Sequence, residues 1–214
     1  MNLVFLGPAG SGKGTQAKKL ESAYGVVQIS TGDLLREAVR EGTPLGQKAE
    51  PLMRQGKLVP DDLVIGVIED RFRQGGLEKG VLLDGFPRTL PQAEALDSMF
   101  ARTGVRLDKV LSLEVPPSIL VDRVTGRRSC PKCGTVYHVK AAPPKVPGIC
   151  DLDGTELIQR SDDTAEKLAN RLAVFETEIP KVKRHYGDRG LLAEVDGTGA
   201  PDEVFARIRE ALGA

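Results

Sequence analysis

The sequence of 214 residues predicts an α/β protein, in which a five-stranded parallel sheet is covered by helices on both faces. Three observations support this fold class. Five short apolar runs have the length of buried strands. Segments with a helical spacing of apolar residues alternate with these runs, as in proteins whose parallel strands are joined by helices. A glycine-rich loop follows the first run, so ligands are expected at the carboxyl ends of the strands.

The expected strands and helices follow one another along the whole chain. The apolar runs that we interpret as strands are residues 3–6, 26–29, 81–83, 110–115 and 191–195. Helical spacing of apolar residues occurs in 63–72, 96–100 and 204–212, and a further helix is expected to begin at Pro117. If that helix continues far enough, Arg123 and Arg127 share one of its faces, because they are four residues apart.

Two segments interrupt the alternation. Residues 30–59 have a helical pattern that begins with a capping box at Ser30 and Asp33 and is interrupted by glycine and proline. Residues 126–163 are rich in proline and glycine and contain all three cysteines. We interpret both segments as insertions that could close over bound ligands.

The composition argues against several classes of partner. Lysine plus arginine and aspartate plus glutamate number 30 each, so the protein lacks the overall positive charge that favours DNA or membrane surfaces. Aromatic residues make up only 4% of the chain, which leaves few platforms for stacking nucleic-acid bases. No secretory leader precedes the first strand, and no apolar run approaches the roughly 18 residues of a membrane span. We therefore expect a cytoplasmic protein without a nucleic-acid or membrane partner.

The stretch GPAGSGKGTQ at residues 7–16 is typical of a phosphate-binding loop. Its glycines allow backbone N–H groups to surround a phosphate, and Lys13 can reach the outer phosphate oxygens. The loop opens a helix, whose N-terminus favours an anion. Gly14 stands where the general pattern has a hydroxyl, and Thr15 follows one place late, so Mg²⁺ is expected to be held largely through water and the nucleotide. The alternative is an ordinary glycine-rich turn.

The stretch VLLDGFPR at residues 81–88 is a strand that ends in an aspartate. Phosphate-loop proteins hold Mg²⁺ or its waters with such a residue, so Asp84 is a candidate for this role. Arg88 adds a cation at the same sheet edge. A turn or helix-capping role for Asp84 remains an alternative.

Four more arginines flank the second insertion, with Arg123 and Arg127 before it and Arg160 and Arg171 after it. Transfer of a phosphoryl group between two nucleotides concentrates negative charge, and guanidinium groups suit its stabilisation. Each arginine could instead be an ordinary surface residue. His138 and His185 belong to no recognisable triad, and we interpret both as surface residues.

The cysteines and one aspartate form two half-sites with the spacing of a zinc knuckle. Cys130 and Cys133 make the first half, and Cys150 and Asp153 repeat the spacing. Four protein ligands leave no open position for a reacting water, so the site would be structural and would hold a small hairpin together. A redox pair is an alternative for the first half, and Fe²⁺ for the metal.

Six motifs together resemble a known family. In order and spacing they match adenylate kinases with the long lid, in the branch that carries zinc, and they cover essentially the whole chain: GPAGSGKGTQ (7–16), STGDLLR (30–36), GKLVP (56–60), DGFPRTLPQA (84–93), VDRVTGRR (121–128) and QRSDD (159–163). The resemblance implies a three-layer sandwich of the P-loop NTPase type with a helical insertion and a small zinc-containing lid. The core would be residues 1–29, 60–125 and 164–214, the nucleoside-monophosphate-binding domain 30–59, and the lid 126–163.

The resemblance also implies an activity: reversible, Mg²⁺-dependent transfer of the terminal phosphoryl group of ATP to AMP, which gives two ADP, in a monomer whose lid closes. The donor site would consist of Lys13, the amides of Gly10, Ser11, Gly12, Gly14 and Thr15, and Arg123, Arg127, Val136, Tyr137 and Gly199, with Arg123 stacked on adenine. The acceptor site would consist of Thr31, Arg36, Lys57, Leu58, Val59, Gly85, Phe86, Pro87, Arg88 and Gln92. The transferring group would be neutralised by Arg88, Arg127, Arg160 and Arg171, the last two of which would also reach the acceptor phosphate.

Some assignments remain open at this stage. Asp162 and Asp163 match acidic positions at the hinge of the lid, and they could also cap the helix before Thr164. The nearest competing functions are another nucleoside-monophosphate kinase and a kinase that uses GTP, because the choice of base depends on few contacts such as Gln92. A GTPase is disfavoured because no N-K-x-D motif occurs, and the few lysines near the cysteines give little support to a zinc ribbon that binds nucleic acid.

Overall fold

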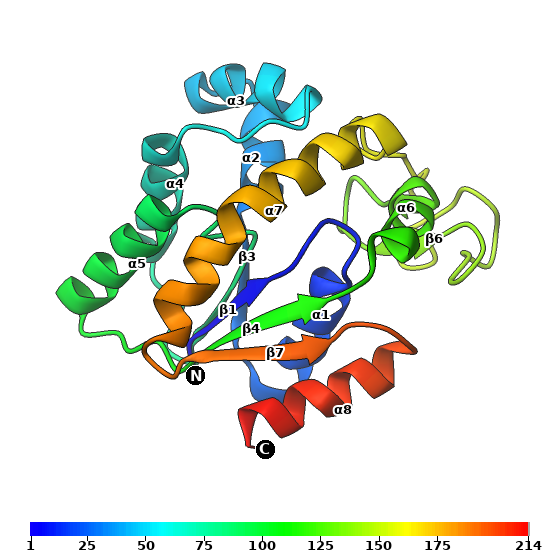
Figure 1. Ribbon diagram of the computed structural model, residues 1–214. Helices are drawn as coiled ribbons and strands as arrows, with labels where there is room; N and C mark the ends of the chain where they lie inside the picture. The colour runs from blue at the N-terminus through cyan, green and yellow to red at the C-terminus, as the bar shows by residue number, and fades with distance from the viewer. Residues whose placement is uncertain (214) are drawn as a thin grey trace.

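A five-stranded, wholly parallel sheet forms the centre of the molecule (Figure 1), in the computed structural model that describes residues 1–213. The strand order is β2-β3-β1-β4-β7. The strands are β1 (Leu3–Leu6), β2 (Val27–Ser30), β3 (Val81–Asp84), β4 (Lys109–Glu114) and β7 (Leu192–Asp196). All four pairings are parallel, so the predicted sheet is confirmed with strand ends that shift by one residue.

Helices cover both faces because alternate residues of each strand face opposite sides. Leu3 and Phe5 of β1 pack with α1 (Lys13–Tyr24) and α8 (Pro201–Leu212) in one apolar cluster. Val4 and Leu6 pack in the other cluster, with α4 (Asp61–Arg73), α5 (Leu90–Thr103) and α7 (Ala165–Gly187). The three-layer arrangement predicted from the sequence is confirmed.

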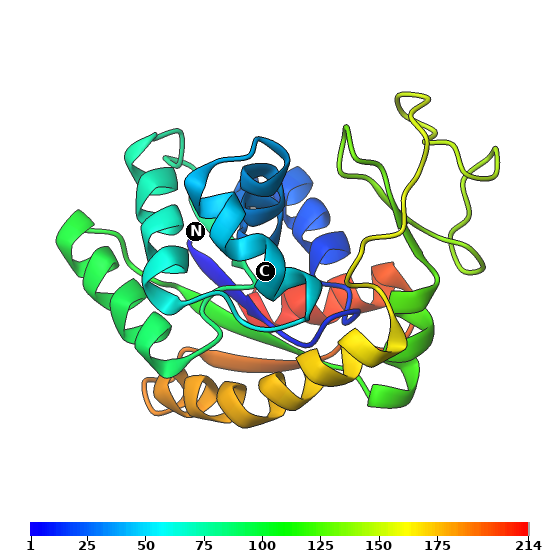
Figure 2. The ribbon, with the colours of Figure 1, turned by 90° about the horizontal axis from the view of Figure 1, so that it is seen from above.

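Residues 30–59 form two helices, α2 (Thr31–Arg40) and α3 (Pro44–Arg54), which Figure 2 shows above the sheet. The Ser30 hydroxyl accepts a hydrogen bond from the Asp33 N–H at 3.3 Å and so caps α2. The Asp33 carboxylate was expected to bond back to Ser30, but it accepts from Arg36 at 2.5 Å instead. Because of that pairing, Asp33 does not complete the predicted capping box.

Residues 126–163 stand apart from the sheet in Figure 2. They contain the antiparallel pair β5 (Arg127–Ser129) and β6 (Val136–His138) and three isolated bridges. The preceding helix α6 (Pro117–Thr125) ends before Arg127, so the prediction that Arg123 and Arg127 share a helix face is wrong. The chain leaves the helix at Gly126, where an added Cβ would lie 2.3 Å from His138 Nε2. Arg127 is thus carried by β5 and Arg123 by α6.

None of the helices formed by residues 1–213 has an apolar stretch long enough to cross a membrane.

Candidate active site

The glycine-rich loop lies between β1 and the N-terminus of α1. Gly7, Gly10 and Gly12 have positive φ angles of 144°, 84° and 100°, which glycine adopts readily. The Ser11 hydroxyl is buried and has no hydrogen-bond partner among the described residues. A buried polar atom beside the free N–H groups of a helix N-terminus suits a bound phosphate. The structure therefore fits the prediction of a phosphate-binding loop rather than an ordinary turn.

Lys13 is the first residue of α1, and its side chain bends back over the loop. Its ammonium group donates to the carbonyl oxygens of Gly7 at 2.7 Å and Pro8 at 3.0 Å. Burial, opposed by Asp84 and assisted by Arg88, Arg171 and Arg127, lowers the pKa of Lys13 to about 8. A phosphate would supply the negative charge that this ammonium group lacks.

Asp84 ends β3 directly beside Phe5 of β1, which confirms its predicted place at the sheet edge of the loop. Its carboxylate accepts from Gln28 Nε2 at 3.2 Å, and Thr89 rather than Asp84 caps the next helix. Arg88 lies in the same region, where its Nε donates to the Gly85 carbonyl oxygen at 2.7 Å. Burial lowers the pKa of Arg88 to about 10, so the guanidinium is still charged near neutral pH.

Two of the arginines named above, Arg127 and Arg171, are paired with carboxylates. Arg127 makes two hydrogen bonds to the fully buried Asp163, one of them from Nε at 2.8 Å. Although burial opposes it, this pairing raises the pKa of Arg127. Arg171 of α7 donates to Asp162 at 2.9 Å. The helix-capping alternative for both aspartates is wrong, because the Thr164 hydroxyl itself caps α7. Asp162 and Asp163 are counter-ions to arginines.

Arg160 belongs to the same electrostatic group through a different partner. It lies 3.8 Å from the Asp33 carboxylate, the group that also binds Arg36. Burial, with a further contribution from Arg36, lowers the pKa of Arg160 to about 10. The lid and α2 therefore meet at one carboxylate shared by two arginines.

Arg123 of α6 bridges two loops, the phosphate loop and the loop after β7. Its Nη1 donates to the carbonyl oxygens of Gly197 at 3.2 Å, Gly10 at 3.4 Å and Ser11 at 3.5 Å. The planar guanidinium thus lies between the phosphate loop and the loop that carries Gly199, which follows β7.

A cavity between α2, α3, α7 and the loop after β3 collects most of the predicted acceptor residues. These are Thr31, Arg36, Lys57, Leu58, Val59, Gly85, Arg88 and Gln92. Three predicted residues do not line it. The Phe86 ring is packed in the core cluster, Pro87 lines the neighbouring cavity, and Arg160 lines neither of the two cavities. Leu35, Met53 and Val64 also line the acceptor cavity and were not predicted. Their helical spacing resembles that of core residues, so the sequence offers no signal that separates them.

Gln92 is buried, and both ends of its amide have partners. Its Oε1 accepts from the Arg88 N–H at 2.8 Å, and its Nε2 donates to Asp61 at 2.7 Å. Asp61, which also accepts from the Thr89 hydroxyl at 2.9 Å, was missed as a positioning residue. Because a carboxylate only accepts, Asp61 fixes which way the amide points. One amide hydrogen and one oxygen lone pair remain for a base.

On the donor side, Tyr137 differs from its expected use. Its hydroxyl accepts from the Asp151 N–H at 2.8 Å and lies 3.5 Å from Cys150 Sγ, so the ring belongs to the interior of the lid. Only its backbone remains for a nucleotide. Val136 beside it is exposed.

Cys130, Cys133, Cys150 and Asp153 come together as predicted, with one ligand atom of each within 4.8 Å of all the others. The Cys133 and Cys150 sulfurs are 3.5 Å apart, and the Cys130 sulfur is 3.4 Å from the Asp153 carboxylate. Two ligand atoms at the corners of a tetrahedron around Zn²⁺ lie roughly 3.8 Å apart when the Zn–S bonds are 2.3 Å. The Thr155 N–H lowers the pKa of Asp153, which keeps its oxygens available as ligands. The residues therefore fit a zinc ion.

The two histidines, expected to be surface residues, are partly buried and contact neighbouring elements. His138 Nε2 contacts the Asp122 carbonyl oxygen at 2.9 Å, and His185 Nε2 contacts Asp97 at 2.7 Å. Both connect neighbouring elements, and neither lines the cavities described above.

Comparison with known proteins agrees with this geometry. The family model described as adenylate kinase matches residues 5–191. A relative named adenylate kinase from Carboxydothermus hydrogenoformans is 52% identical over 99% of each chain. Relatives of the same name from Moorella thermoacetica and Archaeoglobus fulgidus are each 49% identical, over 100% and 99% of this chain and 98% of their own. The chain belongs to the adenylate kinase family.

Proposed function

We propose that this protein transfers the terminal phosphoryl group of Mg²⁺-bound ATP directly to AMP, reversibly, and so forms two ADP. One observation carries the proposal: Arg88 and Arg171 line both the acceptor cavity and the adjoining cavity that contains Lys13 and the phosphate loop. A phosphoryl group held between these three cations can pass from a donor on the loop to an acceptor in the cavity. Such transfer depends on positioning and charge stabilisation and needs no side-chain nucleophile.

The donor would lie along the loop, with its phosphates on Lys13 and the amides of residues 10–15 and its base near Arg123 and Gly199. The Asp84 carboxylate, at the same sheet edge, would hold Mg²⁺ or its waters. When bound, the ion supplies positive charge to the phosphate oxygens. Gly14 offers no hydroxyl beside Lys13, so Asp84, whose charge acts on Lys13, is the carboxylate proposed for this role.

The acceptor would place its phosphate near Arg36, Arg88 and Arg171 and its base near Gln92. The free hydrogen and lone pair of the Gln92 amide match the donor and acceptor edge of adenine. The apolar wall of Leu35, Met53 and Val64 would pack against the flat faces of the base.

In this proposal the hinge carboxylates neutralise the arginines until nucleotides arrive. Asp162 and Asp163 pair with Arg171 and Arg127, and the phosphates of two nucleotides would compete for the same guanidinium groups. The exchange would let residues 126–163 move as a lid and residues 30–59 move as the acceptor domain over the core of residues 1–29, 60–125 and 164–214. Closure would exclude water, so that the phosphoryl group is transferred to the second nucleotide and not to water.

The metal of the lid would be structural. Cys130, Cys133, Cys150 and Asp153 would supply all four ligands of Zn²⁺, and its role would be to hold the two turns of the lid together. Because thiol ligands must stay reduced, the cytoplasm is the expected compartment. A monomer is the expected state, because one chain supplies every residue of the site.

The test is an assay of the purified protein with Mg·ATP and, in turn, AMP, GMP, CMP and UMP, with the nucleotide products identified. We expect two ADP for each AMP consumed and little turnover of the other three. Lys13→Ala should lower turnover by about 100-fold or more, while Lys18→Ala, on the same helix, should not. Rapid turnover with a pyrimidine acceptor only, or with GTP in place of ATP only, would contradict the proposal.

A further inference from the structure

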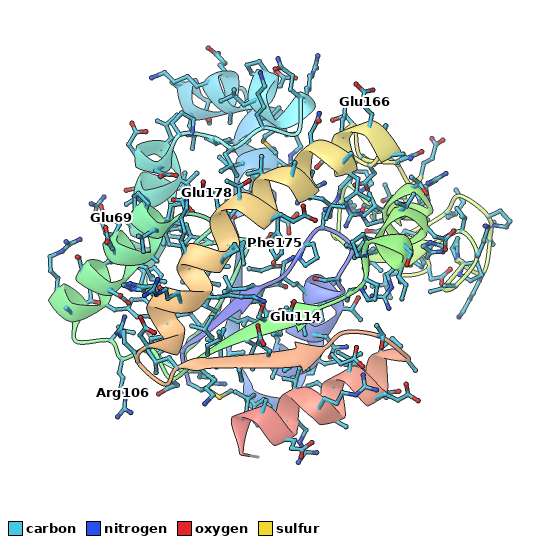
Figure 3. All side chains as sticks on the ribbon, in the orientation of Figure 1. Glu69, Arg106, Glu114, Glu166, Phe175 and Glu178 are labelled. Atoms are coloured by element: carbon cyan, nitrogen blue, oxygen red, sulfur yellow. The ribbon has the colours of Figure 1, made fainter. Side chains whose placement is uncertain are left out.

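A cavity beside the acceptor pocket is lined by two chemically different sets of side chains. Lys13, Arg88 and Arg171 are the cationic set. The apolar set, called the apolar wall below, consists of Ala9, Leu58, Pro87, Val174, Phe175 and Ile179. Figure 3 shows Phe175 below α7, between that helix and β1.

The apolar wall could affect phosphoryl transfer because three cations line the same cavity. In the proposed function, which this inference extends, Lys13, Arg88 and Arg171 surround the transferring phosphoryl group. Since the same three side chains line this cavity, the apolar wall faces that group. Water that entered here would lie beside the reacting phosphorus.

Closure of the lid and of residues 30–59 does not supply most of this wall. Val174, Phe175 and Ile179 all lie on α7, and Phe175 is packed against the apolar cluster on that face of the sheet. The seal on this side is therefore built into the core. Of the apolar wall, only Leu58 comes from the acceptor segment of residues 30–59.

We propose that Phe175 determines the acceptor of the phosphoryl group by excluding water on the α7 side, so that AMP rather than water receives it. In transfer, the bond between the terminal phosphorus and the bridging oxygen of ATP breaks, and a bond to an AMP phosphate oxygen forms. In hydrolysis the same bond breaks, a bond to a water oxygen forms, and phosphate and a proton are released. A bound water needs two to four polar partners, and the phenyl ring offers none.

Truncation of this ring would change the balance. Phe175→Ala would free roughly 100 Å³, which is room for about three waters. An apolar cavity of that size often stays dry, but Lys13, Arg88 and Arg171 supply polar partners at this one. The enlarged space would therefore fill with water.

The experiment compares inorganic phosphate release with ADP formation, as initial rates with Mg·ATP and saturating AMP, in the full-length protein. Phe175→Ala should raise the ratio of hydrolysis to transfer by about tenfold or more, and Phe175→Leu, which keeps most of the side chain, should raise it less. Phe72→Ala is the matched control, because Phe72 packs in the same cluster but against Phe100, at 5.6 Å between ring centroids. It should lower the melting temperature without changing the ratio.

Two results would overturn the inference: an unchanged ratio in Phe175→Ala, or an equal rise in Phe72→Ala. If Phe175→Ala does not fold, the ratio in Phe175→Leu decides, and no rise there counts against the inference. Failure of the wild-type protein to phosphorylate AMP would instead refute the proposed function. The two failures are thus distinguishable.

Discussion

The central sheet and the lid are stabilised by different means. Leu3, Leu82 and Leu111 are completely buried in the core, where apolar area removed from water provides most of the stability. The lid of residues 126–163 has a buried apolar cluster of only four residues, two of which are the cysteines Cys130 and Cys150. Where apolar burial is scarce, a metal site can replace it. The comparison shows how a segment with little buried apolar area can bring its side chains together around a cluster of possible metal ligands.

The largest expected effect is on the lid and follows loss of its metal. Structural zinc contributes on the order of 10 kcal/mol to the order of such knuckles, so Cys130→Ser should lose the metal and the ordered lid. Turnover should fall by about tenfold or more, because Arg127 and Arg160 are carried by the lid. The main unfolding transition of the core should move little.

Metal analysis, limited proteolysis and calorimetry test this prediction together. The wild-type protein should contain about one Zn²⁺ per chain, and the variant should be cut within residues 126–163. Val146→Ser, at an exposed position of the same segment, serves as the control. Equal protease resistance with and without metal would show that the metal does not stabilise residues 126–163, and the proposed difference from the central sheet would be wrong.

The second prediction concerns removal of a buried apolar side chain from the central sheet. Leu82→Ala should lower the free energy of unfolding of the whole protein by about 2–5 kcal/mol, because it leaves a cavity beside the central strands. Leu157→Ala in the lid should have a smaller effect on that transition while the metal is bound. Denaturant titration of both variants gives the comparison, and equal losses would contradict it.

A smaller effect is expected where the lid joins the core. Asp163→Asn removes the charge that neutralises Arg127, which should cost about 1–3 kcal/mol in the nucleotide-free protein. ATP phosphates would replace the lost charge, so ATP should raise the melting temperature more in the variant than in the wild type. Glu156→Gln, an exposed acid in the same segment, should behave like the wild type. Equal stabilisation by ATP in both proteins would show that Asp163 does not compete with the nucleotide.

The smallest effect concerns pH and the phosphate loop. Burial lowers the pKa of Lys13 to about 8 in the free protein, and bound phosphates would raise it again. Between the two pKa values ATP binding therefore takes up a proton, and affinity should fall by at most tenfold per pH unit above about pH 8. Below about pH 7 this group is charged in both states and contributes no pH dependence.

Calorimetric titration with ATP at pH 8.5, in two buffers of different ionisation enthalpy, measures that proton directly. The apparent binding enthalpies should differ at pH 8.5 and converge near pH 6.5. Equal values at pH 8.5 would place the pKa of Lys13 elsewhere.

Much of the site was predictable because its chemistry depends on local sequence. The phosphate loop, Asp84 at a strand end and the paired C-x₂-C and C-x₂-D spacings each act within a few residues of chain. The residues of the acceptor cavity were predicted from a family resemblance. Such a prediction includes every residue of a motif, and the ring of Phe86, which belongs to the motif, packs in the core instead. Asp61 and Phe175 were not predicted, because Asp61 bonds to Gln92 and Phe175 lines a cavity together with Lys13 and Arg88, all distant in sequence.

The sequence by itself determined the order of strands and helices, the phosphate loop and the metal ligands, because these follow from periodicity and short spacings. Only the tertiary structure decided which carboxylate neutralises which arginine and that α6 ends before Arg127. It also decided that the Tyr137 ring faces the lid interior. The physical reason is that ion pairs and cavity linings bring together residues more than 30 positions apart in the sequence, such as Arg127 and Asp163. Local sequence patterns do not indicate which distant residues will be in contact.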